Sequence, residues 1–171
     1  MTALTFDPDS LAAVREGDAS VVLMHMQGEP ATMQLAPRYA DAQREVLAFL
    51  EARVAACLGA GIARERIAVD PGIGFGKTLA HNLELLAGLD GLKRLGVAVL
   101  VGVSRKSFIA RLSREEAAKD RLGGSLAGAL AACARGADIL RVHDVGQTRQ
   151  ALAVWQAIAA ATPERQSLVI D

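Results

Sequence analysis

The sequence has few aromatic residues, no excess of either charge and no long apolar run. Aromatic side chains make up only 4% of the 171 residues, and a chain rich in alanine, leucine and glycine suits helices packed on a parallel sheet better than a β-sandwich. Lysine plus arginine number 19 and aspartate plus glutamate number 19, so no global field attracts nucleic acid or an anionic membrane. No apolar run approaches the roughly 18 residues that span a bilayer. We therefore expect neither nucleic acid nor a membrane as a partner.

Cysteine is also scarce, and the first residues do not look like a leader. Cys57 and Cys133 lie far apart, with no CxxC and no neighbouring histidine at ligand spacing, which argues against a disulfide or a zinc site. The start, MTALTFDPDS, lacks the basic-then-apolar layout of a signal peptide, so we expect a cytoplasmic protein. A chain that is 51% hydrophobic can bury one core, and we expect a single domain over residues 1–171.

Four short apolar runs are typical of strands buried on both faces, and each is followed by a segment with helical spacing. The runs lie at 21–24, 67–69, 97–103 and 138–142. The longest helical segment is expected from about Tyr39 to Leu58, and another is expected ahead of the first strand, from about Pro8 to Glu16, with Asp7 as its N-cap. Repeated βα units predict parallel strands and an α/β fold. Four strands alone do not close a (β/α)₈ barrel.

The stretch DPGIGFGKT at 70–78 ends like a nucleotide-binding P-loop. A P-loop needs a glycine five residues before its last glycine, so that backbone N–H groups surround a phosphate. Pro71 stands at that position and has no N–H to offer. We therefore expect no nucleotide here, and we expect Lys77 to be a loop or helix-start residue rather than a phosphate ligand.

Ligands of parallel α/β folds bind at the carboxyl ends of the strands, where this sequence is unusually polar. Asp70 could accept two N–H bonds from a flat heterocycle, or it could satisfy its own Asp-Pro turn. Glycines alternate at 72, 74 and 76, which indicates a backbone that runs close to a ligand, with the ring of Phe75 presented between them.

Two further segments at the strand ends indicate an anion site. Ser104-Arg105-Lys106-Ser107 lies at a strand-to-helix junction, where two cations and helix N–H groups suit an anion, although a solvated basic helix start is the alternative. Arg141 and His143 are two apart on one strand, so we expect both to face the same side and to grip a phosphate or pyrophosphate.

The remaining histidines and methionines have ordinary interpretations. His25 alternates with Met24 and Met26, which favours a structural histidine over a catalytic one, and His81 is expected on a helix surface. The two methionines could line a flat apolar pocket, although filling the core is the commoner role.

Five segments, taken together and in this order, resemble the dihydropteroate synthase family of the folate pathway. They are LMHMQGEPATMQ at 23–34, DPGIGFGK at 70–77, VGVSRKSFI at 101–109, RLGGSLA at 121–127 and RVHDV at 141–145. The resemblance implies a (β/α)₈ barrel that joins 6-hydroxymethyl-7,8-dihydropterin pyrophosphate to p-aminobenzoate and releases pyrophosphate. It implies that this chain is the C-terminal half of that barrel, about four βα units, truncated at its amino end.

The resemblance also implies roles for individual residues. Lys106, Arg141 and His143 are the expected catalytic residues, with Arg141 and His143 on the leaving pyrophosphate. The other expected substrate contacts are Asp70 on the aminopyrimidine edge of the pterin, Met24 and Gly102 along its slot, and Phe75, Ser107 and Lys106 beside p-aminobenzoate. Mg²⁺ is expected with the pyrophosphate, with no protein metal ligand and no nucleotide, and a homodimer is expected through the helices after the third and fourth strands.

Two alternatives remain open from the sequence. The family's early strands, which supply an aspartate and an asparagine, and its two mobile amino-terminal loops have no counterpart in this sequence, so we expect this chain to be inactive alone. It could instead be a non-catalytic module that binds a pterin or phosphate. A related pterin-binding methyltransferase domain is a third possibility, but it would be expected to lack the SRKS and RVHDV segments.

Overall fold

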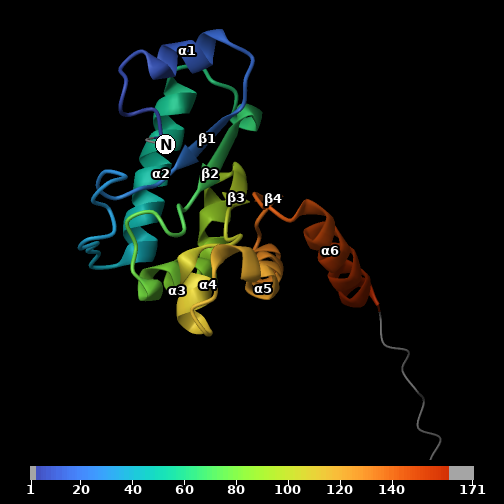
Figure 1. Cartoon of the computed structure of the whole chain (residues 1–171). Coiled ribbons are helices and arrows are strands. Elements are labelled where there is room, and N and C mark those ends of the chain that lie inside the picture. Colours follow the sequence, from blue (N-terminus) through green and yellow to red (C-terminus); the bar gives the residue numbers. More distant parts are fainter. Residues whose placement is uncertain (1–2, 162–171) are drawn as a thin grey trace, which may run out of the picture.

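The computed structural model describes residues 3–161, and its centre is a parallel sheet of four strands in the order β1-β2-β3-β4 (Figure 1). The strands are β1 (Val21–Met24), β2 (Ile67–Asp70), β3 (Ala98–Val101) and β4 (Ile139–Leu140). Met24 pairs in register with Asp70, and Val101 pairs with Leu140. Because neighbouring strands run in the same direction, all four carboxyl ends lie at one edge of the sheet.

Helices alternate with the strands, as the sequence predicts, and the α/β fold class is confirmed. The α-helices are α1 (Ser10–Glu16), α2 (Ala42–Gly59), α3 (Leu79–Ala87), α4 (Ser107–Leu112), α5 (Leu122–Ala134) and α6 (Val145–Ala160). Short 3₁₀ helices occupy Arg64–Arg66, Leu89–Leu95 and Ala118–Asp120. Within residues 3–161, no helix has both the length and the apolar character needed to cross a membrane.

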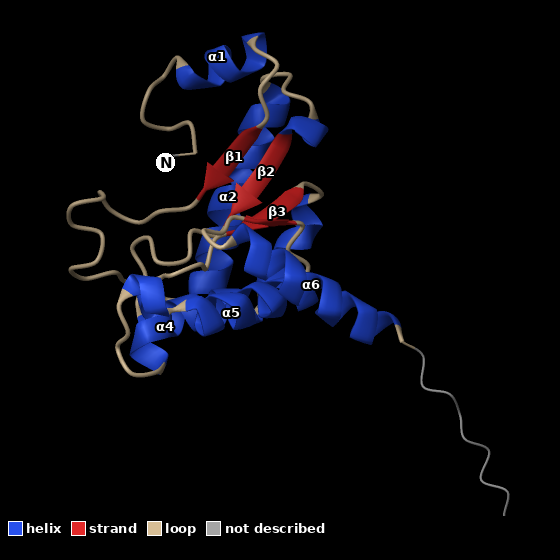
Figure 2. Cartoon of the chain, turned by 45° about the vertical axis from the view of Figure 1, so that its right-hand side comes forward, coloured by secondary structure: helices blue, strands red, loops and turns tan. Residues whose placement is uncertain are grey.

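The core lies between the first three strands and the helices that cover them. All four residues of β2 are buried, and α2 packs Val46, Leu50 and Val54 into the same apolar cluster. The outer strands are less protected, since Val22 of β1 is 42% exposed and Ile139 of β4 is 43% exposed. Helix α6 packs on α5 and extends away from the strands (Figures 1 and 2). The described sheet therefore has a well-buried centre and two open edges.

Several predicted boundaries are wrong by a few residues. Helix α1 begins at Ser10 rather than Pro8, because Asp7 closes a turn: its carboxylate accepts a bond from the Asp9 N–H at 2.8 Å and its carbonyl accepts one from Ser10. Strands β3 and β4 are shorter than their apolar runs. The chain leaves β3 after Val101 to form the polar loop that leads into α4, and β4 has only β3 as a partner.

Candidate active site

The loop after β2 is pressed against the segment that follows β1. Gly72 has φ +69° and Gly76 has φ +62°, and a Cβ on either would overlap the carbonyl oxygen of His25 or Gln27, respectively. Gly74 instead faces the Lys106 side chain, and a Cβ on Gly74 would lie 3.3 Å from Cδ of Lys106. The alternating glycines were expected to allow close approach to a ligand, but the structure uses two of them for close approach of the chain to its own backbone. The loop is therefore held in place by backbone packing.

Asp70 lies at the end of β2 and is almost completely buried. Its side chain is 1% exposed, one oxygen accepts the Gly72 N–H at 2.7 Å, and the other pairs with Nη2 of Arg141 at 3.0 Å. Burial raises the pKa of this carboxyl, while the Gly72 N–H and the charges of Arg141, Lys106 and Lys77 act in the opposite direction. The turn predicted as the alternative role is present, and it uses only one of the two oxygens.

Arg141 reaches Asp70 across Gly102. A Cβ at position 102 would stand 3.1 Å from Nη2 and 3.2 Å from Nε of Arg141, so glycine leaves room for the guanidinium. The family resemblance implies that Arg141 and His143 contact the pyrophosphate and that Asp70 holds the edge of the pterin. In the structure, the planar guanidinium of Arg141 lies beside the Asp70 carboxylate.

Lys106 and Phe75 form a cation–ring contact at the same edge of the sheet. Nζ of Lys106 lies 4.7 Å from the centroid of the Phe75 ring and donates to the carbonyl oxygen of Ile73. Burial lowers the pKa of Lys106 to about 8, Arg141 adds to this effect and Asp70 opposes it. The side-chain amide of Gln34, from the long loop after β1, donates to the Gly74 carbonyl at 2.5 Å. An aromatic face and a cation with a lowered pKa are therefore held together.

His143 is held by the β3–α4 loop. The Ser104 hydroxyl accepts the backbone N–H of His143 at 3.2 Å and lies 3.0 Å from its Nδ1. Ser107 is exposed at the first position of α4, a helix of six residues. Met24 is buried at the end of β1.

Arg105 and Lys106 do not act as the pair of cations that the sequence suggested. Arg105 adopts a left-handed backbone with φ +60°, and its guanidinium binds Asp144 through two bonds of 3.1 and 2.5 Å. Its backbone N–H donates to the Ser125 hydroxyl at 2.9 Å. Arg105 therefore joins three segments of the chain, and Lys106 alone turns toward Asp70 and Phe75.

Lys77 is the residue that sequence reasoning missed. It is 2% exposed, its Nζ donates to the Phe75 carbonyl at 3.0 Å, and it lies 3.0 Å from Nδ1 of His25. Burial lowers the pKa of Lys77 to about 7, helped by Lys106 and opposed by Asp70. Lysine is rarely buried, so the sequence pattern offered no signal except the tight glycine loop before it.

The two other histidines have structural roles. His25 is buried against Phe49, with the rings 5.0 Å apart and edge to face, which confirms the structural interpretation. Burial lowers its pKa to about 4, with Lys77 adding to the effect. His81 lies on a helix, as expected, but it is half-buried and caps α3: its backbone N–H donates to the Thr78 hydroxyl at 3.2 Å and its Nδ1 accepts the Thr78 N–H at 3.3 Å.

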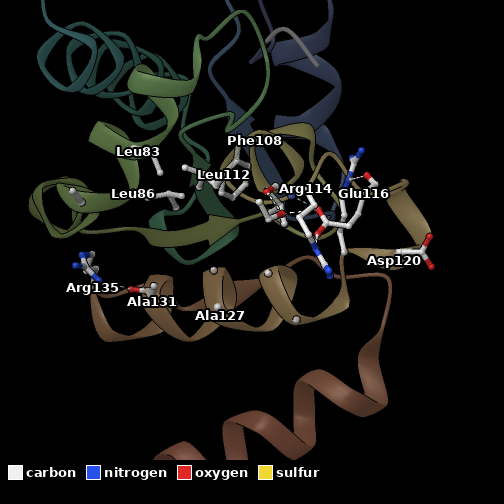
Figure 3. Close-up of a pocket in the computed structure, with 17 residues that line it drawn as sticks. Leu83, Leu86, Phe108, Leu112, Arg114, Glu116, Asp120, Ala127, Ala131 and Arg135 are labelled. Atoms are coloured by element: carbon white, nitrogen blue, oxygen red, sulfur yellow. Dashed lines mark hydrogen bonds and ion pairs between the residues drawn. The ribbon is translucent and has the colours of Figure 1, made fainter.

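A large groove lies away from these residues, between α5 on one side and α3 and α4 on the other (Figure 3). Its volume is about 660 Å³, and Leu83 and Leu86 lie across it from Ala127 and Ala131. Phe108 and Leu112 of α4 also line it. No residue predicted for substrate binding lines it. The groove is therefore separate from the strand-end cluster, by which we mean Asp70, Phe75, Lys77, Lys106 and Arg141.

Comparison with known proteins gives consistent matches. A family model described as "Pterin binding enzyme" matches residues 1–143. The chain is 52% identical to the dihydropteroate synthase of Neisseria meningitidis serogroup B over 147 residues, which cover 84% of this chain and 52% of the relative. It is also similar to the solved structure of dihydropteroate synthase from Xanthomonas albilineans in complex with 7,8-dihydropteroate, with a TM-score of 0.86 and 46% identity over 94% of this chain and 60% of that one.

A second structure of the Xanthomonas albilineans enzyme, with 4-aminobenzoic acid, has a TM-score of 0.86 and 47% identity over 94% of this chain and 56% of that one. The chain thus spans about half the length of the curated relatives it matches. Its four parallel strands correspond to part of the barrel of those proteins.

Proposed function

This chain belongs to the family of pterin-binding enzymes, and on that basis we propose that it carries pterin, 4-aminobenzoate and pyrophosphate contacts of a dihydropteroate synthase. The observation that carries the proposal is the buried Asp70 carboxylate, surrounded by the cations Arg141, Lys106 and Lys77 at the carboxyl ends of the strands. A fixed anion at this place selects a ligand that presents N–H donors, while the surrounding cations suit a ligand that also carries negative charge.

The pterin edge is the natural partner for Asp70. Its aminopyrimidine ring presents N–H groups in one plane, and the carboxylate oxygen that now contacts Arg141 can accept them once the guanidinium moves away. Met24 ends β1 and Gly102 directly follows β3, the two strands that flank β2, and in this proposal they form the sides of the slot.

The second substrate, 4-aminobenzoate, is proposed to bind at Phe75, Lys106 and Ser107. The Phe75 ring offers a face to the aromatic ring, and Lys106 offers a positive charge close to that face. Ser107, exposed beside Lys106, adds a hydroxyl to the same border.

In the proposed reaction the amine nitrogen of 4-aminobenzoate attacks the methylene carbon of the pterin. The bond between that carbon and the pyrophosphate oxygen breaks, its electron pair leaves with pyrophosphate, and the amine loses a proton. Arg141 and His143 would stabilise the negative charge that develops on the leaving group. Removing one such cation is expected to cost on the order of 10²–10³ in rate, by analogy with the loss of an oxyanion donor.

Magnesium belongs to this proposal through the pyrophosphate. In residues 3–161 no group of three or more histidine, cysteine, aspartate or glutamate side chains is placed to hold a metal ion. Mg²⁺ is commonly bound through substrate phosphates with few protein ligands, so a magnesium pyrophosphate fits these residues. The ion would neutralise charge on the phosphate oxygens.

A homodimer through α5 and α6 and a cytoplasmic location complete the proposal. An apolar groove of about 580 Å³ runs between the two helices, and Val154 and Ile158 of α6 are among the most exposed apolar side chains. Burying them against a second copy would remove apolar surface from water. Sedimentation should show association that Ile158→Glu weakens, and cell fractionation tests the location.

A non-catalytic pterin-binding module is the second candidate, because the chain covers about half the length of its relatives while retaining the Asp70 slot. Calorimetry with 6-hydroxymethylpterin, followed by an assay of pyrophosphate release with the pterin pyrophosphate and 4-aminobenzoate, separates the two. Binding with turnover supports the synthase, and binding without turnover supports the module.

The role of Asp70 is tested by Asp70→Asn. The amide presents N–H groups where the pterin needs an acceptor, so binding should weaken by roughly 1–3 kcal/mol, while 4-aminobenzoate binding should change little. The same substitution at the exposed Asp18 is the matched control. Unchanged pterin affinity in Asp70→Asn would contradict the proposal.

A further inference from the structure

Lys77 has no part in the proposed reaction, yet it is one of the largest fully buried side chains of the described residues. Its aliphatic stem and ammonium group lie beneath the loop that joins β2 to α3. Burying a lysine costs free energy unless its charge and its N–H donors find partners. The partners that Lys77 finds therefore indicate what it does.

The Lys77 ammonium joins two segments that carry the site. It donates to the carbonyl oxygen of Phe75 at 3.0 Å and lies 3.0 Å from Nδ1 of His25, which follows β1. A Cβ on Gly72 would come within 3.4 Å of Nζ, so the group sits directly below the start of the loop. Lys77 thus ties the loop that follows Asp70 to the end of the neighbouring strand.

The charges around Lys77 come from several elements. Asp70, at the end of β2, raises the pKa of Lys77, while Lys106, from the β3–α4 junction, lowers it. His25, at the end of β1, has a pKa of about 4 and is neutral at pH 7. The Tyr39 ring centroid lies 5.9 Å from Nζ.

Asp70 in turn faces three cations from three places in the chain. Arg141 comes from the end of β4, Lys106 from the β3–α4 junction, and Lys77 from its own loop. Of these, Arg141 is half exposed and pairs with an oxygen that a ligand would need. Lys77 is the cation that ligand binding would leave in place, because it is enclosed below the loop.

We propose that Lys77 is a positioning residue of this site, which fixes the loop bearing Phe75 and holds its ammonium group next to Gly72, whose N–H binds the Asp70 carboxylate, so that the charge of Lys77 acts on that carboxylate. Its effect on pterin binding rests on the proposed function, whereas its coupling to Asp70 does not. Methionine has nearly the same length but leaves the Phe75 carbonyl without a donor and His25 Nδ1 without its partner. Arginine keeps the charge but brings a wider head group into an enclosed space.

The first test uses the ligand-free chain and NMR titration of the Asp70 carboxyl carbon and the Lys77 Nζ. Lys77→Met should raise the pKa of Asp70, because a nearby positive charge is lost, and Asp70→Asn should lower the pKa of Lys77, because a nearby negative charge is lost. Lys119→Met and Asp18→Asn, both at exposed positions, should leave both values unchanged. If neither reciprocal shift occurs, the coupling does not exist and the proposal is wrong.

The second test measures binding of 6-hydroxymethylpterin by calorimetry between pH 4.5 and 8. In Lys77→Met the acid side of the profile should move to higher pH, and affinity at pH 7 should fall on the order of tenfold, as for an unpaired buried acceptor. A role limited to stability would lower the folded fraction without moving the profile, and that result would overturn the charge role.

Failure of the proposed function gives a different result. If the unmodified chain binds no pterin while the reciprocal pKa shifts are present, the function is wrong and the role of Lys77 beside Asp70 stands. If Lys77→Met does not fold, as judged by circular dichroism, the Lys77 titration in Asp70→Asn decides the matter alone.

Discussion

The strand-end cluster and the groove between α3, α4 and α5 show that empty volume and chemistry lie in different places in this molecule. The groove, of about 660 Å³, is lined by apolar side chains of α3 and α4, by the small residues of α5 and by five charged residues, none of which is predicted to bind substrate. The cluster holds a buried carboxylate, two lysines with lowered pKa values and an aromatic ring within a few contacts of one another. Volume alone therefore does not identify the site, whereas convergent, partly compensated charges do.

The two regions also use glycine differently. A Cβ on Gly124 would overlap Cγ2 of Ile109, and one on Gly128 would lie 3.3 Å from Cγ2 of Val103, so α5 packs closely on α4 and on the segment that follows β3. In the loop after β2, Gly72 and Gly76 combine close approach with a left-handed backbone. At the groove, glycine allows close helix packing, whereas at the strand-end cluster it allows a tightly fixed loop beside the charged residues.

The largest expected effect comes from Gly72→Ala, which sharpens this contrast. The new methyl group would be strained at φ +69° and would overlap the His25 carbonyl. We expect a loss of at least about 3 kcal/mol in the free energy of unfolding and loss of pterin binding. Urea unfolding measures the first and calorimetry the second.

The matched control is Gly123→Ala in α5, at the groove, where nothing lies within 4 Å of the added Cβ. Helix propensity predicts that it stabilises by up to about 1 kcal/mol. Equal losses for the two variants would remove the distinction between the loop and the helix.

The next largest effect is expected on the pH dependence of stability. The strand-end cluster should act above pH 7, and the groove should act below pH 4.5. Lys77 has a pKa of about 7 in the folded chain and an ordinary value of 10.5 when unfolded, so the unfolded chain binds more protons between these values. The free energy of unfolding should therefore rise from pH 7 to pH 10, by about 1–3 kcal/mol, and Lys77→Met should remove most of the rise.

At the groove, hydrogen bonds from Ser113 and nearby backbone N–H groups lower the pKa of Glu116 from 4.5 to about 2. Its contribution to stability is present above pH 4.5 and is lost as the pH falls toward 2, and Glu116→Gln should alter only this acid range. Urea unfolding across the pH series checks both ends. A rise above pH 7 that persists in Lys77→Met would show that Lys77 is not its source.

A smaller effect is expected from Arg141→Ala. Binding of 6-hydroxymethylpterin should stay within about threefold of the unmodified chain, while binding of the pterin pyrophosphate should weaken by about tenfold or more, as for a lost charged partner. Arg135→Ala at the groove, where the guanidinium bonds only the Ala131 carbonyl among the described contacts, should change neither. Similar losses for both ligands in Arg141→Ala would contradict its role with pyrophosphate.

For ATP we expect no binding at all. Calorimetric titration with MgATP should give no saturable heat, since Pro71 replaces the glycine that a P-loop requires and Lys77 is enclosed below its own loop. Micromolar binding that Lys77→Ala abolishes would overturn this prediction.

The sequence by itself determined the order of elements and the edge at which the chemistry gathers. The four apolar runs became β1 to β4, because continuous apolar runs between helical segments are stable only as covered parallel strands. Parallel strands bring their carboxyl ends together, so Asp70, Lys106 and Arg141 could be assigned to one edge before any contact was known. The DPGIGFGK and RVHDV segments are short continuous patterns, so they showed the family resemblance without any knowledge of tertiary contacts.

Only the tertiary structure decided which charges meet. Arg141 pairs with Asp70 across 71 positions of the sequence, Lys77 meets His25 across 52, and Arg105 takes Asp144 across 39, leaving Lys106 to the site. Local patterns encode the backbone conformation of a segment, but burial and ion pairing depend on neighbours supplied by other segments. In the sequence, Lys77 and Lys106 look alike, because each is a lysine in a loop that follows a strand. In the structure they differ, because Lys77 is buried beneath its own loop and Lys106 lies over the Phe75 ring.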